Sequence, residues 1–342
     1  GEGGRERFTT NTSFAAAKVN KKGRDWQDRF ISEGMKLEGS AGGYDYSATV
    51  NVNYYNKDSV REDTRLRNAT WWMKNEKLQL MLGDTSSYLS RYVLNGVNYR
   101  GLNLKMGHYT DSFSGLKDEI TILYGKVPYF WLTGDEYIYP REIAAIRNEI
   151  DIREWWEMNT TLAYIWDSYP RIIDLDANNK AKENALLEMD QVFRLIPGIW
   201  TFSNETALSY ADDDREGPGK LLRGWATYFA SDMKINKLKI YNSYERIDPE
   251  FRSFVGLSGY TANKQVTIDR EHILNFIDYA PYDEVDFGAQ YSKTRTNLHK
   301  SYDTQTIEEN NYKAHLKIMP VNGLPRFSLR GSVWTSSSGP GT

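Results

Sequence analysis

Apolar and polar residues alternate along much of this chain, and the alternation restarts many times. Residues 48–54 read Ala-Thr-Val-Asn-Val-Asn-Tyr, with the apolar side chains mainly at even positions. Residues 158–166 and 312–318 repeat the same parity. Successive side chains of a β-strand point to opposite faces, so a period of two predicts strands with one apolar and one polar face.

Segments with this pattern follow one another from end to end of the chain. They lie at 8–19, 30–40, 44–55, 65–74, 77–84, 97–107, 118–127, 140–153, 156–166, 185–196, 199–211, 222–234, 237–247, 271–279, 284–294, 309–319 and 325–335. Many such strands predict an all-β, antiparallel, up-and-down transmembrane β-barrel of about 16 strands. Single-chain bacterial barrels have even strand numbers, whereas this tally is odd. We therefore expect either one wrongly assigned segment or terminal strands missing from a partial chain.

The connections between these segments alternate in length. Short turns are expected at Gly42-Gly43, Asn75-Glu76, Pro197-Gly198 and Asn236-Lys237. Long polar stretches lie between them, at 56–64, 167–184, 212–221, 248–270 and 295–308. A barrel inserted in one orientation has short turns on one side of the membrane and long loops on the other, so this alternation favours a membrane barrel.

Residues 140–153 fit either a helix opened by Pro140 or a strand. As a strand, the segment has apolar side chains at most even positions and a ladder of charges at odd positions. We favour the strand, because such a ladder is tolerated in a water-filled lumen. The candidate lumen-lining residues are Arg141, Arg147, Glu149, Asp151 and Arg153.

Composition changes this picture only in detail. The 342 residues are 40% hydrophobic, with a mean hydropathy of −0.65, and no run of 18 apolar residues is present. A barrel with a polar lumen and polar loops is compatible with such a low hydropathy, and we expect one barrel domain over 1–342. The 24 Tyr and 10 Trp are typical of aromatic belts at membrane interfaces. An alternative is a soluble extracellular all-β protein that binds glycans through exposed aromatic side chains.

Paired or tripled aromatic residues stand near the ends of several predicted strands, where a membrane interface would hold them. The candidate membrane-interface residues are Trp71, Trp72, Trp131, Trp155 and Trp156.

Charge and reactive residues give little support to catalysis. The net charge of −3 leaves no basic excess for nucleic acid, so no nucleic-acid partner is expected. Cysteine is absent, which removes thiol catalysis and disulfides. The four histidines, at 108, 272, 299 and 315, show no metal-ligand spacing. We expect no enzyme activity, no catalytic residues, no cofactor and no metal.

Three segments resemble motifs of a family of bacterial outer-membrane β-barrel proteins. Residues 82–104 resemble a G-D…S-x-x-L…G-x-x-x-R-G motif, and residues 134–143 resemble a later element of the same kind. Residues 244–253, Tyr-Glu-Arg-Ile-Asp-Pro-Glu-Phe-Arg-Ser, resemble a Y-x-R-x-x-P-x-F-x-S segment in which a strand leads into a loop. The chain departs from the family at residues 334–342, which do not form a strand ending on an aromatic residue.

The resemblance implies a place in the bacterial outer membrane and a role as a pore, conduit or scaffold for transport or secretion. It also implies contact with outer-membrane lipid and with other envelope or secretion-complex proteins. The family does not share one transported substrate, so the resemblance names no solute.

Overall fold

The protein is all-β in the part of the chain that the computed structural model describes. These residues are 6–21, 24–57, 63–109, 117–127, 141–168, 181–212, 219–254, 269–298, 306–319 and 326–339. No helix in these ranges is long and apolar enough to cross a membrane. The strands are β1 (Glu6–Lys21), β2 (Arg24–Ala41), β3 (Tyr44–Lys57), β4 (Asp63–Lys74), β5 (Leu78–Ser90), β6 (Leu94–Tyr109), β7 (Lys117–Val127), β8 (Arg141–Arg153), β9 (Trp156–Asp167), β10 (Glu183–Ile196), β11 (Trp200–Asp212), β12 (Leu221–Ile235), β13 (Leu238–Ile247), β14 (Arg270–Tyr282), β15 (Val285–Thr296), β16 (Thr306–Ile318) and β17 (Phe327–Gly339).

Every strand pairs with the next strand along the chain, and every pair is antiparallel. This confirms the predicted all-β, antiparallel, up-and-down fold. The described strands number 17, one more than the expected total of about 16, and each predicted segment overlaps one of them.

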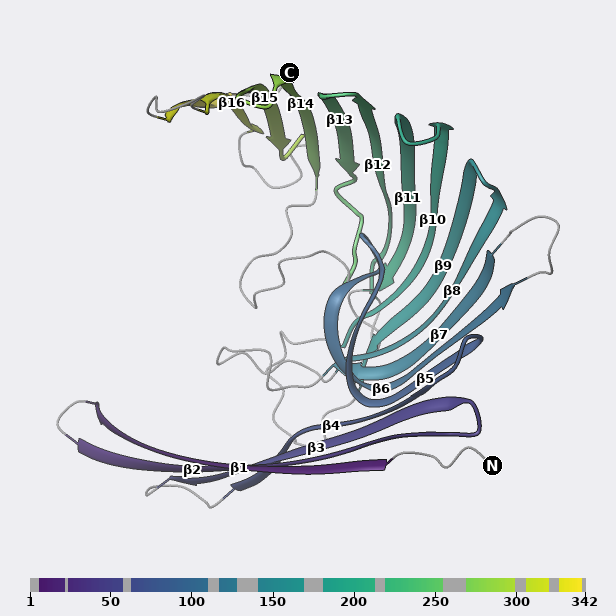
Figure 1. Ribbon diagram of the computed structural model, residues 1–342, viewed down its shortest axis with the longest axis vertical. Helices are drawn as coiled ribbons and strands as arrows, with labels where there is room; N and C mark the ends of the chain where they lie inside the picture. The colour runs from purple at the N-terminus through teal and green to yellow at the C-terminus, as the bar shows by residue number, and fades with distance from the viewer. Residues whose placement is uncertain are drawn as a thin grey trace.

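The sheet is strongly curved and encloses a concave side (Figure 1). Strands β1 to β3 form one end of the curve, and β15 to β17 lie at the other end. No register joins β1 to β17 within the described ranges, so closure into a complete barrel stays a prediction.

The segment at 140–153 is a strand. Strand β8 pairs with β7 along one edge and with β9 along the other. Ile143 and Arg147 are buried on one face, while Ile146 on the other face is 43% exposed. A helix is thereby excluded, because every second side chain shares a face.

The long polar stretches lie at one end of the sheet, and most of the short turns lie at the other. Connections from an even-numbered strand to the next odd one include the tight turns at residues 42–43, 154–155, 197–199 and 236–237. At the first of these turns, Gly42 and Gly43 have φ angles of 60° and 80°, which suit glycine and match the twist of a hairpin. All the long polar stretches join an odd-numbered strand to the next even one, so they share the other end. The predicted sidedness is confirmed for the five long stretches and these turns, while the short β1–β2 and β5–β6 connections, of two and three residues, are exceptions at the long-loop end.

The outer face of the sheet is apolar, and the inner face carries most of the buried polar groups. One outer row crosses five neighbouring strands through directly paired residues. The residues of this row are 40–51% exposed, and they are Ile146, Leu162, Leu187, Leu208 and Trp225. On the concave side, Glu188, Thr161 and Asn184 are almost completely buried. This distribution is the reverse of that in a water-soluble protein.

Candidate pore constriction

Two chain segments fold onto the concave side of the sheet. The first is the β5–β6 tip, residues 88–94, at the end of a long hairpin that bends inward (Figure 1). The second is the β13 extension, residues 248–254, which follows β13. Side chains of both segments belong to the main buried apolar cluster, so the interior is narrowed where they meet.

The β5–β6 tip is anchored by apolar burial. Leu89, Tyr92, Val93 and Leu94 are each at most 2% exposed. Burying side chains of this size stabilises a protein by about 1.5–3 kcal/mol each. The tip is therefore a fixed part of the interior.

Polar side chains of the wall hold the same tip. Ser90 Oγ donates a hydrogen bond to Glu188 Oε2 on β10. The Arg91 backbone N–H donates to Glu205 Oε1 at 2.8 Å, and the guanidinium lies 3.3 Å from Glu205 Oε2. That guanidinium also stacks on the Tyr228 ring, 3.5 Å from its centroid. Three wall strands, β10, β11 and β12, thus position the turn at Arg91.

Tyr92 joins the tip to the β13 extension. Its hydroxyl donates to Glu245 Oε1 at 3.3 Å, and its backbone carbonyl accepts a hydrogen bond from Ser253 Oγ at 2.5 Å. Its ring meets the Phe251 ring edge-on, with the centroids 5.8 Å apart. Burial, with the nearby Glu245 carboxylate, raises the pKa of the Tyr92 hydroxyl, so this group stays neutral and keeps its proton for the hydrogen bond.

The β13 extension lies directly on the backbone of the wall. The Arg252 N–H donates to Ser209 Oγ at 3.0 Å, and the Arg252 carbonyl accepts from Asn184 Nδ2 at 2.7 Å. A Cβ at Gly224 would lie 2.1 Å from the Phe251 backbone nitrogen. Only glycine leaves enough room for this close approach of two backbones.

Charged groups on the inner faces of β8 and β10, with Thr161 on β9 between them, form a second network. Arg147 donates to Glu149 at 2.8 Å and to Asp190 at 2.9 Å. The same guanidinium donates to Thr161 Oγ1 at 3.2 Å. Buried charges are stable only when paired and hydrogen-bonded, and here Arg147 has partners on three strands.

The predicted lumen residues are distributed between this network and its edges. Arg147 and Glu149 lie on the concave face, and Arg141 there bonds to Asp167 at 2.8 Å and to the Phe254 carbonyl at 3.0 Å. Asp151 and Arg153 flank a register shift next to the turn, and Arg153 is exposed. The role of these residues in lining a lumen stays a prediction.

Sequence analysis missed the groups that hold the β5–β6 tip, namely Arg91, Glu188, Glu205 and Glu245. Glu188 carried a usable signal. It lies between the apolar residues Leu187 and Met189, so the alternation that places those two on the outer face places Glu188 on the inner face. Arg91 carried none, since it lies in a turn whose contacts are all distant in sequence.

The predicted interface aromatics lie near the turns at one end of the sheet. Trp156 stacks on Phe193, with centroids 5.8 Å apart, and Trp155 is 44% exposed beside it. Trp71 pairs with the exposed Leu82, whereas Trp72 pairs with the buried Ser47. Trp71 therefore shares the outer face, and Trp72 points to the inner one. Trp131 and residues 134–140 lie outside the described ranges.

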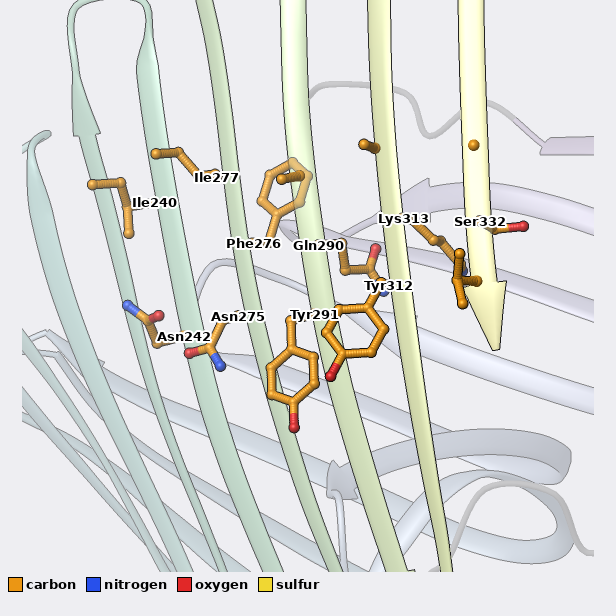
Figure 2. A pocket seen from close by; sticks show the side chains of 14 residues that line it. Ile240, Asn242, Asn275, Phe276, Ile277, Gln290, Tyr291, Tyr312, Lys313 and Ser332 are labelled. Atoms are coloured by element: carbon orange, nitrogen blue, oxygen red, sulfur yellow. The ribbon is translucent and has the colours of Figure 1, made fainter. Parts of the chain in front are cut away.

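The outer face also has a shallow hollow of about 660 Å³ over β13 to β17 (Figure 2). It forms where the small residues Ala289, Ala314 and Gly331 lie between Ile277 and Val333. The Tyr291 and Tyr312 rings lie side by side at its edge, 5.0 Å apart. A surface of this kind offers apolar contact and few hydrogen-bonding groups.

Comparison with known proteins finds resemblance only among solved structures. No family model and no curated protein matches the chain. OccK3 (OpdO) of Pseudomonas aeruginosa is 13% identical, with 97% of this chain and 89% of that chain covered and a TM-score of 0.48. OccAB2 of Acinetobacter baumannii is 11% identical, covers 97% and 92% of the two chains, and has a TM-score of 0.47. OprD of Pseudomonas aeruginosa is 11% identical, covers 97% and 89%, and has a TM-score of 0.47.

The close approach at Gly224 gives a test of the constriction. We expect Gly224→Ala to displace the β13 extension, because its Cβ would overlap the Phe251 backbone nitrogen. Trypsin should then cut after Arg252 faster than in the parent protein. Gly331→Ala is the matched control, since a Cβ there meets nothing within 4 Å. Equal cleavage of the two variants would contradict the backbone contact.

Proposed function

We propose that this protein is a bacterial outer-membrane β-barrel that forms a narrowed pore or conduit, or scaffolds one, for transport or secretion. The observation that carries the proposal is the continuous apolar outer face, with polar and charged side chains buried on the concave side. A lipid environment outside the sheet accounts for the apolar outer face and for the placement of polar groups on the inner face. Its partners are outer-membrane lipid and, for a scaffold, other envelope proteins.

The height of the apolar band supports a bilayer. Trp156 and Trp166 stand on the same face of β9, ten positions apart. Ten residues at about 3.3 Å each span roughly 33 Å of strand. At a tilt of about 40° this projects to about 25 Å, the height of the lipid-facing band of outer-membrane barrels. Aromatic residues therefore stand at both edges of a band of bilayer thickness.

The interior supports a narrowed passage. The β5–β6 tip crosses from its own hairpin to β10 and β13, and the β13 extension meets it there through Tyr92. A solute would pass beside this contact, between Arg91 of the tip and the wall residues Glu205 and Glu245. Because the charges are of both signs, we expect weak ion selectivity.

A non-enzymatic role fits the same geometry. The charged side chains of the constriction are engaged with one another and with the two folded segments, which is the arrangement of a structural network. The soluble glycan-binding alternative is less favoured. Its exposed aromatic residues would gather in one binding surface, whereas the exposed large apolar residues here extend from β2 to β17.

A pair of arginine substitutions on β10 tests the membrane assignment. We expect Leu187→Arg, in the middle of the apolar band, to destabilise the folded protein by about 2–4 kcal/mol in a bilayer. Leu195→Arg, next to the turn, should cost no more than about 1 kcal/mol. Both leucines are exposed, at 40% and 49%. Urea unfolding in lipid vesicles measures the difference, and equal small losses would indicate a water-exposed face.

Conductance in a planar bilayer tests the constriction as a pore element. Tyr92→Ala removes the side chain that joins the two folded segments, so the tip should loosen and single-channel conductance should rise severalfold. Tyr282→Ala, at a turn where the side chain is 67% exposed, is the control and should leave conductance unchanged. If folded protein conducts in neither form, the pore is rejected and the scaffold is retained.

A further inference from the structure

A second polar cluster lies on the concave side of β14, β15 and β16, away from the constriction. It contains Asp278, Asp286 and His315, one residue from each strand. The candidate ligand atoms of the three side chains lie within 4.8 Å of one another. All three residues are partly buried, so the cluster is reachable from the interior.

The spacing in the cluster suits a shared ion better than direct hydrogen bonds. His315 Nε2 lies 3.4 Å from Asp278 Oδ1 and 3.4 Å from Asp286 Oδ1. A normal N–H···O hydrogen bond spans about 2.7–3.2 Å, so both separations are long. Ligands about 2.0–2.1 Å from a tetrahedral Zn²⁺ are roughly 3.4 Å apart. His315 Nε2 therefore already stands at the separation from both carboxylates that one metal ion would impose, and all three ligand atoms lie within 4.8 Å of one another.

Gly288 creates the space for this approach. Asp278 pairs with Gly288 across one strand boundary, and Gly288 pairs with His315 across the next. A Cβ at Gly288 would lie 2.6 Å from His315 Cε1 and 2.9 Å from Asp278 Oδ1. Any other residue would hold the two ligands apart.

An unsatisfied atom gives the cluster an independent need for a cation. Asp278 Oδ1 is fully enclosed, and the nearby His315 Nε2, 3.4 Å away, is too distant for a hydrogen bond of normal length. An enclosed carboxylate oxygen without a close hydrogen-bond donor is costly, and a metal ion removes the cost. The neighbouring cations Lys239, Lys317 and Arg330 stand opposite Asp278, Asp286 and His315 in the strand registers. They balance the charge of the cluster without supplying that partner.

We propose that Asp278, Asp286 and His315 bind one divalent transition-metal ion, with Zn²⁺ as the best match, and that water completes its coordination. Two carboxylates and one imidazole are a ligand set that Zn²⁺ accepts, and three protein ligands leave one position open. The ion joins β14, β15 and β16 near their turn end. The site is independent of the pore, because the constriction uses other strands.

Metal titration of the full-length chain without a polyhistidine tag tests the site. The folded protein in detergent is titrated with Co²⁺, followed by visible absorption, and with Zn²⁺ in competition with a chromogenic chelator. We expect one ion per chain and the absorption of tetrahedral Co²⁺. His315→Gln and Asp286→Asn should each weaken binding by at least about tenfold, the scale seen when groups supporting a metal are lost.

Two further variants separate this site from adventitious binding. His272→Gln should leave binding unchanged, because His272 bonds to Thr294 and lies six residues, about 20 Å, along β14 from Asp278. Gly288→Ala should weaken binding without removing a ligand. Heat-dependent mobility in SDS gels verifies the folding of each variant. If Gly288→Ala does not fold, the His315→Gln and Asp286→Asn variants alone decide the test. Absence of binding, or binding that persists in His315→Gln and Asp286→Asn, overturns the proposal.

Discussion

Hydrogen bonding between neighbouring strands is the constraint on which the rest of this structure depends. Each strand from β2 to β16 has a hydrogen-bonded neighbour on both edges, and β4 and β5, which pair over only five positions, have the shortest ladder. With the backbone satisfied, the outer side chains are free to be apolar, as a hydrocarbon environment requires. The outward-facing row from Ile146 to Trp225 is apolar for this reason.

With the outer face apolar, the polar and charged side chains of the strands lie mainly on the concave side. There, buried charges are stable only when they are paired, and the partners come from different elements: Arg147 of β8 with Asp190 of β10, and Arg91 of the β5–β6 tip with Glu205 of β11. The β5–β6 tip and the β13 extension use these groups as anchors, and Gly224 provides the room for them to sit on the wall. Strand pairing thus allows the apolar outer face, and the charges on the inner face anchor the two segments that form the constriction.

The strands were predictable because their signal is local. Alternation at 48–54 and 158–166 fixes both the strand and its faces, and the charged segment at 140–153 fits the same rule. The constriction was not predictable, because its contacts are remote in sequence: Tyr92 and Glu245 are 153 residues apart. Residues 88–94 lie between the predicted segments at 77–84 and 97–107, and nothing in their sequence identifies their partners on β10 to β13. The Asp278, Asp286 and His315 cluster was missed for the same reason. The spacing rules for metal ligands apply to residues close in sequence, whereas these three lie on three different strands.

The outer face against lipid is the central claim, and the absence of cysteine makes it directly measurable. Leu162→Cys and Ala163→Cys place a single label on neighbouring residues of β9, one 51% exposed on the outer face and one 7% exposed on the inner. In vesicles with spin-labelled acyl chains, a fluorophore at position 162 should be strongly quenched and one at 163 should not. Equal quenching at both positions, or quenching at 162 only by a water-soluble agent, would contradict the membrane-spanning account.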